Sequence, residues 1–148
     1  MSDETQVATP PTITIEDVKY LIDDLSDRGK LLVSDLYRTS MEYNELFRNY
    51  NQTVTLTNTY ASGLKGEVEK ANLPEKTEES ESSITIEDKS YDGSDLPDTV
   101  KAYINELVRA NNNKSSLEFR LRQLDAARNA YISSLKVDIS NSDIQAIE

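Results

Sequence analysis

The sequence predicts a mainly α-helical protein made of two tandem repeats, each a short β-hairpin followed by a long helix with heptad spacing. Three observations support this fold: an internal repeat, a head of alternating β-branched residues in each copy, and regularly spaced apolar residues behind each head. Residues 84–136 align with residues 13–65 without a gap at an offset of 71, and 19 of the 53 aligned positions are identical. Two copies of one unit are expected to share one fold, with their helices packed as an antiparallel pair or as a coiled-coil oligomer.

The repeat divides the 148 residues into five segments. A polar leader ends in two prolines, an acidic stretch with several serines joins the copies, and the end of the chain keeps isoleucines without a clear period. Gly63 and Gly66 are expected to end the first helix. We therefore assign a disordered leader to residues 1–12, repeat 1 to 13–65, an acidic linker to 66–83, repeat 2 to 84–136 and a frayed tail to 137–148.

Each repeat opens with the sequence Ile-Thr-Ile-Glu-Asp, at residues 13–17 and again at residues 84–88. The alternating β-branched residues predict a strand, and the Glu-Asp pair is placed where a hairpin would turn. Its turn chemistry is weak, because tight hairpins prefer Asn-Gly or Asp-Gly. A two-stranded hairpin is marginal in water, so each head is expected to pack on its own helix, on the other head or on a neighbouring chain.

Helix start signals follow the heads at matching positions. Ser26-Asp27 is a good capping pair in repeat 1, and Pro97-Asp98 places a proline and an acid where the first helical turn favours them. Behind the signal of repeat 2, seam positions recur at alternating spacings of three and four, and two of these positions, Lys114 and Arg128, are charged. We predict that the helices interact through a seam of Leu32, Leu36, Tyr43, Leu46, Tyr50, Tyr60, Leu64, Val100, Tyr103, Leu107, Leu117, Leu121, Leu124, Tyr131 and Leu135.

Two stretches of the helices are ambiguous. Residues 52–57 alternate polar and apolar side chains, which by itself favours a strand, but the aligned residues 123–128 have a helical composition. The repeat therefore predicts a helix at both places, weaker in repeat 1 because threonine is costly in helices. Asn111–Asn113 is poor helix material, yet the heptad phase continues across it. A continuous helix is favoured over two arms that fold at this triplet.

The length of the linker restricts how the helices can pack. A helix of about 38 residues spans roughly 57 Å, and an 18-residue linker reaches at most about 60–65 Å when fully extended. A parallel pair within one chain would need an almost taut linker. An antiparallel pair needs no stretching, and neither does an end-to-end arrangement in which each helix pairs with another chain. We predict the antiparallel pair, with association into homo-oligomers covering the remaining apolar surface.

The composition argues against catalysis. The chain has no Cys and no His, so it can form no disulfide, no ordinary Cys/His zinc site and no nucleophile–imidazole pair. Most of the net charge of −11 lies in the leader, linker and tail, as solvated charge does, and no basic stripe with interleaved aromatics is present. No apolar run approaches the roughly 20 residues that span a bilayer. We predict a soluble non-enzymatic protein without cofactors, nucleic-acid partners or membrane partners.

Asp88–Thr99 is a weak candidate for a calcium loop. It has oxygen-bearing side chains at loop positions 1, 3 and 5 and a glycine at position 6. Thr99 stands where the closing bidentate glutamate is needed, Pro97 interrupts the loop, and repeat 1 has no counterpart of Asp92-Gly93. A turn with solvated acids is therefore the preferred interpretation, and we assign no metal site.

Repeat 2 carries a recognisable pattern at Thr85-Ile86, Tyr91, Leu96, Ala127–Tyr131 and Leu135-Lys136. Repeat 1 matches it in outline at Thr14-Ile15, Tyr20, Leu25, Asn58, Tyr60 and Leu64-Lys65. With this pattern the repeat unit resembles a family of short, uncharacterised coiled-coil proteins of tailed phages that infect marine cyanobacteria. Members of this family usually have one copy and Asp-Gly or Asn-Gly at the hairpin turn, whereas this chain has two copies and Glu-Asp.

The resemblance implies a viral origin and a small helical protein. Together with the duplicated heptad unit, it leads us to expect a phage structural or accessory protein that acts as a coiled-coil interaction module. Its expected partners are phage structural proteins, and its expected location is the virion or the host cytoplasm. The alternative is an intracellular phage regulator that binds and redirects a host protein.

Overall fold

The computed structural model describes residues 8–78 and 80–147. Each of two β-hairpins is followed by a short 3-10 helix and a 45-residue α-helix. In chain order the elements are β1 (Thr12–Ile15), β2 (Val18–Leu21), Ile22–Asp24, α1 (Asp27–Ala71), β3 (Ser83–Ile86), β4 (Lys89–Asp92), Gly93–Asp95 and α2 (Asp98–Ser142). Every element of the second set begins and ends 71 residues after its counterpart. The predicted pair of hairpin–helix repeats is confirmed.

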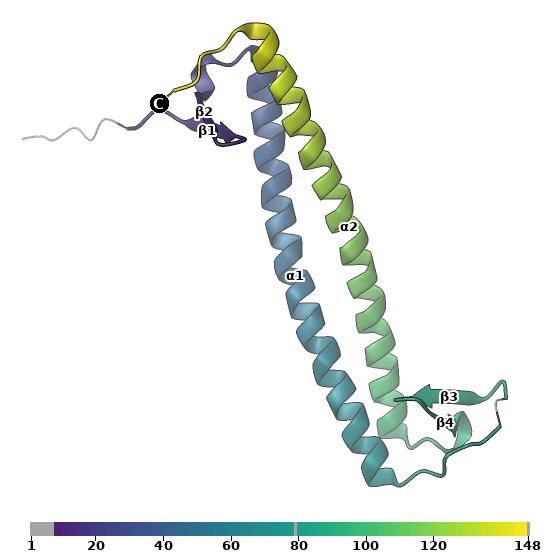
Figure 1. The fold of residues 1–148 in the computed structure, drawn as a ribbon. Helices are drawn as coiled ribbons and strands as arrows, with labels where there is room; N and C mark the ends of the chain where they lie inside the picture. The colour runs from purple at the N-terminus through teal and green to yellow at the C-terminus, as the bar shows by residue number, and fades with distance from the viewer. Residues whose placement is uncertain (1–7, 79, 148) are drawn as a thin grey trace, which may run out of the picture. The chain divides into compact units, whose positions relative to one another are not determined.

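The chain divides into two compact units, and neither of them is a single repeat. Unit 1 contains the described residues up to Leu46 and those from Arg120 onward, and unit 2 is Phe47–Phe119. The hairpin β1–β2 therefore belongs with the start of α1 and the end of α2. The hairpin β3–β4 belongs with the end of α1 and the start of α2 (Figure 1).

Within each unit the two helix segments run antiparallel, as predicted. In unit 1, the Ser26 hydroxyl at the start of α1 donates to Asp138 at 2.5 Å, and Arg120 donates to Glu42 further along α1 at 2.7 Å. Moving forward along α1 thus means moving backward along α2. Unit 2 has the same order, in the contacts Tyr50–Glu118, Thr53–Asn113 and Tyr60–Tyr103.

The Glu-Asp pairs form the predicted hairpin turns despite their weak turn chemistry. Glu16 and Asp17 have φ values of 48° and 65°, and Glu87 and Asp88 have 49° and 64°. Two successive positive φ values are typical of the type I′ turn, whose twist matches that of paired strands. Residues with a side chain adopt this region at a cost, so packing elsewhere must hold the hairpins in place.

The chain that leaves each helix returns to the hairpin of the other repeat. After α2, the Ile147 amide donates to the Lys19 carbonyl at 2.8 Å, and after α1 the Lys76 amide donates to the Ser90 carbonyl at 2.6 Å. These two bonds are also equivalent at an offset of 71. Each hairpin therefore gains a third extended segment beside its second strand.

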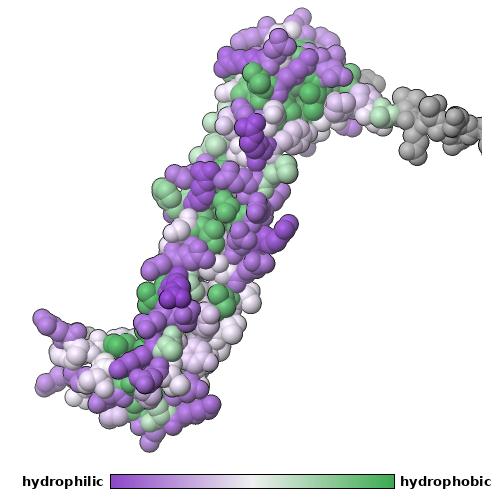
Figure 2. All heavy atoms as spheres, turned by 180° about the vertical axis from the view of Figure 1, so that it is seen from behind, coloured by the Kyte–Doolittle hydropathy of each residue, from purple (hydrophilic) through white to green (hydrophobic). Residues whose placement is uncertain are grey.

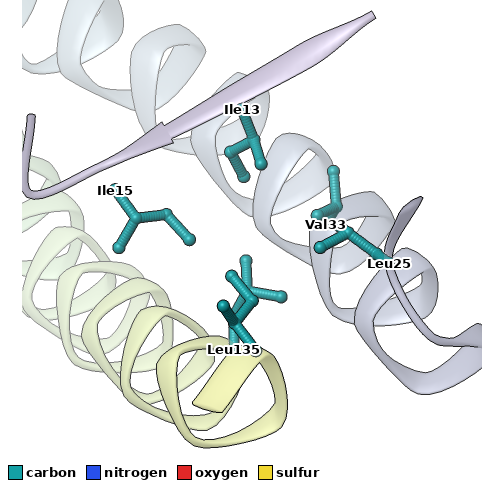
Figure 3. Packing of buried hydrophobic residues seen from close by; sticks show 6 residues of the cluster. Ile13, Ile15, Leu25, Val33 and Leu135 are labelled. Atoms are coloured by element: carbon teal, nitrogen blue, oxygen red, sulfur yellow. The ribbon is translucent and has the colours of Figure 1, made fainter. Parts of the chain in front are cut away.

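Each unit has its own hydrophobic core, and both repeats contribute to it. In unit 1, Ile13 and Ile15 of β1, Leu25, and Val33 of α1 point toward Leu135 of α2 (Figure 3). In unit 2, Tyr91, Leu96 and Val100 of repeat 2 pack with Leu64 of repeat 1. Each hairpin thus packs against the end of the other repeat's helix, and this packing stabilises a two-stranded hairpin that is marginal by itself.

Two predicted boundaries were wrong. Gly63 and Gly66 do not end α1, which continues to Ala71, and the supposed tail is helical to Ser142. The helices stop at Asn72 and Asp143, whose φ values of 48° and 53° lie in the left-handed region that ends many helices. The described linker between elements is correspondingly shorter than residues 66–83.

The residues after the predicted end of repeat 2 take part in the core. Ile139 is buried, and Ile144 packs on the core of unit 1. Their counterparts, Val68 and Leu73, pack on the core of unit 2 in the same way. The predicted frayed tail is therefore part of the folded repeat up to these residues.

Both ambiguous stretches are helical. α1 runs through residues 52–57, where Thr53 and Thr57 donate their hydroxyl groups to the carbonyls of Asn49 and Thr53, four residues earlier. This back-bonding satisfies the hydroxyl without leaving the helix. α2 runs through Asn111–Asn113 without interruption, as favoured. In the described part of the chain, no helix combines the length and apolarity needed to cross a membrane.

Candidate protein-interaction site

The hairpin of unit 1 has one closed edge and one open edge. Ile147 bonds to the outer edge of β2 at Lys19, so that edge is occupied. In the register of β1 with β2, Ile13 and Ile15 exchange bonds with Tyr20 and Val18, and the backbone groups of Thr12 and Thr14 point outward. Among the described residues, no backbone group pairs with that outer edge of β1. We refer to it as the open edge of β1.

A groove runs along this open edge. Its floor and walls come from β1 and both helices, and its volume is about 630 Å³. Most of the surface that lines it is apolar, although the lining residues include both polar and apolar side chains. The lining residues are Thr12, Ile13, Thr14, Ile15, Glu16, Leu36, Tyr37, Ser40, Arg128, Ile132 and Lys136. An extended backbone on β1 would place alternate side chains toward this groove.

Charged groups at the groove are held by partners within unit 1. Lys136 forms an ion pair with Glu16 of the hairpin turn. Arg128 donates to Asp125 at 3.0 Å, and its guanidinium lies 4.6 Å from the ring centre of Tyr43. The charged part of the groove is therefore largely neutralised, and its recognition chemistry is that of apolar side chains and backbone.

The apolar surface continues from the groove onto α1. Tyr37 lines the groove and is 52% exposed, and Met41, one helical turn further, is 73% exposed. Neither residue belongs to the predicted seam. The face drawn in Figure 2 shows hydrophobic residues scattered between hydrophilic ones. Tyr37 and Met41 therefore add exposed side chains of α1 beside the open edge of β1.

The equivalent place in unit 2 is more closed. The Ser83 amide, at the outer edge of β3, donates to the Ser80 carbonyl of the linker at 3.0 Å, so part of that edge is already used. Thr57 and Ala61 replace Arg128 and Ile132 at the aligned positions. A hollow of about 100 Å³ that borders Ile86 lies instead toward β4 and the end of α1. Unit 1 therefore carries the stronger candidate site.

Each predicted seam residue is buried or half-buried. Leu64, Val100, Leu121, Leu124 and Leu135 are buried. Leu36 lies in the candidate groove as well as on the core. The remaining seam residues are half-buried: Leu32, Leu36, Tyr43, Leu46, Tyr50, Tyr60, Tyr103, Leu107, Leu117 and Tyr131.

Several residues of the site were not singled out from the sequence. Ile132 and Tyr37 are apolar but fall outside the heptad seam, and Met41 lies on the same face as Tyr37. Apolar residues outside the heptad phase are the signal that could have indicated a second surface. The open edge of β1 has no comparable signal.

Away from the hairpin, the helix contact in unit 2 becomes polar. The Tyr50 hydroxyl donates to Glu118 at 3.0 Å, and this hydrogen bond, with burial and the glutamate charge, raises the pKa of Tyr50 above its usual value of 10.0. The Thr53 hydroxyl is buried and accepts from Asn113 at 3.4 Å. The polar contacts in this part of the seam fix how the two helices align more than they add hydrophobic stability.

Asp88–Thr99 forms secondary structure and does not wrap as a calcium loop. Asp88 lies in the hairpin turn, and the next residues form β4. The Asp92 carboxylate accepts the Ser94 amide at 3.0 Å and hydroxyl at 2.8 Å, and Lys76 lies 3.6 Å away. The Ser94 bonds, helped by the Lys76 charge, lower the pKa of Asp92. In residues 8–78 and 80–147, no three His, Cys, Asp or Glu side chains gather as a metal site would need.

Comparisons with protein-family models, with curated proteins and with solved structures find no match to this chain.

Proposed function

We propose that this chain is a non-enzymatic protein-interaction module that takes an extended segment of a partner protein along the open edge of β1. The observation that carries this proposal is the outward-facing backbone of Thr12 and Thr14 beside the apolar groove. Main-chain hydrogen bonds to β1 would give affinity, and one or two apolar side chains in the groove would give selectivity. The antiparallel helices serve as the rigid support on which the hairpin is mounted.

The partner's side chains are restricted by the lining of the groove. Ile13, Ile15 and Ile132 favour an aliphatic or aromatic side chain in the groove, and the exposed ring of Tyr37 can cover it. Because Lys136 and Arg128 already have acidic partners, a highly acidic segment is not required.

The finer role that we propose is that of an accessory component of a phage particle, in keeping with the resemblance of the repeat unit. Mass spectrometry of purified particles tests this role directly. We expect peptides of this chain in a fixed ratio to the structural proteins. Their absence from intact particles would refute the virion role but not the proposed binding of an extended segment along β1.

The strand-addition mechanism is tested by replacing Thr14 with proline in the full-length protein. Proline removes the outward N–H of residue 14 but no bond of the β1–β2 ladder, since residue 14 faces away from β2. The matched control is Thr85→Pro, at the aligned position of β3. Both variants should keep the helical circular dichroism spectrum of the parent.

Capture from infected cells then distinguishes the possibilities. We expect the parent and Thr85→Pro to retain phage structural proteins and Thr14→Pro to lose them. Equal capture by all three proteins would contradict strand addition at β1. Recovery of a host enzyme in place of structural proteins, lost in Thr14→Pro, would support the regulator alternative instead.

Photo-cross-linking from position 37 is a second test, in which a photo-reactive amino acid replaces Tyr37. Tyr37 lines the groove, whereas Val108, its aligned counterpart, is similarly exposed but borders no such groove. We expect cross-links to the partner from position 37 and not from position 108. Cross-links from position 108 alone would place the partner elsewhere.

A further inference from the structure

A glycine in α1 makes room for a tyrosine of α2. A Cβ atom at Gly63 would lie 2.5 Å from Cε1 and 2.8 Å from Cζ of Tyr103. Carbon atoms do not approach so closely, so the Tyr103 ring occupies the space that any side chain at position 63 would need. Tyr60 packs against the same ring in an edge-on arrangement, with ring centres 6.5 Å apart. The ring is therefore confined on two sides.

Unit 1 has a different combination at the same two positions. The counterpart of Gly63 is Ser134, which is half-buried, and the counterpart of Tyr103 is Leu32, which packs on the core. Unit 2 thus places a tyrosine beside a glycine, whereas unit 1 has a leucine, smaller than tyrosine, and a serine, larger than glycine, at the aligned positions.

A second glycine makes room for a carboxylate in unit 1. A Cβ atom at Gly29 would lie 2.9 Å from Oδ2 of Asp138, the same carboxylate that accepts the Ser26 hydroxyl at 2.5 Å. In unit 2, the counterpart of Gly29 is Val100, which is fully buried in the core. The residues aligned with Ser26 and Asp138 are Pro97 and Glu67. A polar contact in unit 1 is therefore replaced by an apolar one in unit 2.

We propose that these positions make repeat 1 and repeat 2 specific partners and prevent repeat 2 from pairing with a second copy of itself. In such a pair, with the same antiparallel packing, Ser134 would meet the ring of Tyr103, and Val100 would meet Asp138. The Asp138 carboxylate would also lose its hydroxyl donor, because Pro97 has none. Each conflict would occur twice, so the pairing is rejected at four places.

This specificity goes beyond the proposed function, because it decides which surfaces are already used. The contacts at Gly63 and Gly29 disfavour repeat 2 against repeat 2 and leave repeat 1 as its partner. Two copies of this chain are therefore not expected to associate by pairing their second repeats.

The fit at Gly63 is tested in the full-length protein by Gly63→Ser, with Gly66→Ser as the matched control. Helix propensity alone predicts that both variants melt higher than the parent. A Cβ at Gly66 meets nothing within 4 Å, so that control is expected to melt at or above the parent temperature. The crowding at Tyr103 is expected to lower the melting temperature of Gly63→Ser, on the order of 5 °C. A rise in Gly63→Ser equal to that of the control would overturn the proposal.

The complementarity itself is tested by adding Tyr103→Leu to Gly63→Ser. The double variant installs in unit 2 the combination that Ser134 and Leu32 form in unit 1. We expect it to melt higher than Gly63→Ser, although Tyr103→Leu alone melts lower than the parent. If the decreases in melting temperature of the two single variants simply add in the double variant, the proposed complementarity is refuted. If Gly63→Ser does not fold, Gly63→Ala poses the same question with a smaller side chain.

Partner choice is measured by placing a protease site in the linker of the full-length protein, cleaving the folded protein, and unfolding and refolding the mixture of halves. Native mass spectrometry then counts the pairs. We expect pairs of repeat 1 with repeat 2 and no pairs of repeat 2 with repeat 2. Repeat 2 pairs at their statistical share would overturn the proposal.

Discussion

Removing one leucine from repeat 2 is expected to loosen the hairpin of repeat 1. Leu135 lies in α2 with no exposed surface, and it packs against Ile13 and Ile15 of β1 (Figure 3). Truncating a buried leucine to alanine costs about 2–5 kcal/mol, depending on how far the surroundings collapse. We take about 3 kcal/mol for Leu135→Ala because its neighbours come from three separate segments of the chain. For a chain of this length the melting temperature should fall by roughly 6–12 °C.

Hydrogen exchange localises this loss. The amides of β1 and β2 owe their protection to a core that Leu135 completes, so they should exchange faster in Leu135→Ala than in the parent. The aligned variant Leu64→Ala removes the corresponding leucine from the core of unit 2 and should instead expose β3 and β4. Leu56→Ala is the control for the substitution itself, since Leu56 is exposed and belongs to neither core.

The expected pattern is a crossover, in which a change in one repeat is felt by the hairpin of the other. If Leu135→Ala accelerated exchange in β3–β4 and spared β1–β2, the assignment of each hairpin to the opposite helix end would be refuted. If both hairpins responded equally to either variant, the two cores would not be separate units.

Three further predictions concern single sites. Asp17→Gly should stabilise the protein by about 1 kcal/mol, because glycine adopts the positive φ of the turn without strain, and thermal melting measures the gain. Asp92 has a lowered pKa, so its contribution to stability is present above its usual pKa of 3.8 and is lost as the pH falls through the lower folded value. Asp92→Asn should therefore be less stable near neutral pH and lose less stability on acidification below about pH 4, measured by denaturant melts across that range. The raised pKa of Tyr50 stabilises the fold below pH 10 and less so as the pH rises through the folded value; a spectrophotometric titration should show one late-titrating tyrosine that disappears in Tyr50→Phe.

The repeat made most of the fold predictable from the sequence. It outweighed the strand pattern at residues 52–57, where the threonine hydroxyl groups bond to earlier carbonyls within the helix. It also supported an unbroken α2 across Asn111–Asn113, where propensity alone favours a bend. A pattern shared by two copies is stronger than the local preference of either one.

The helix ends were mispredicted because glycine has two uses in helices. Gly63 and Gly66 suggested a stop, but Gly63 is needed for the close approach of Tyr103, and α1 continues past both residues. The real stops, Asn72 and Asp143, are aligned at the offset of 71, although they differ in type. Beyond Lys136 the two copies share similar residues but few identical ones, so identity alone does not extend the alignment to these helix ends.

The candidate site depends on contacts that side chains do not reveal. Both hairpins contain the same run of five residues, yet in the described part of the chain only β3 has its outer edge partly covered, by the bond from the Ser83 amide to the Ser80 carbonyl. The counterparts Thr12 and Thr9 make no such bond among the described residues. A backbone hydrogen bond places little constraint on the side chains at its two ends, so two copies can keep the same head sequence and still differ in which strand edge is open. The difference between a closed and an open edge is therefore a property of the paired chain, and it is this difference that makes unit 1 the better place for a partner to add a strand.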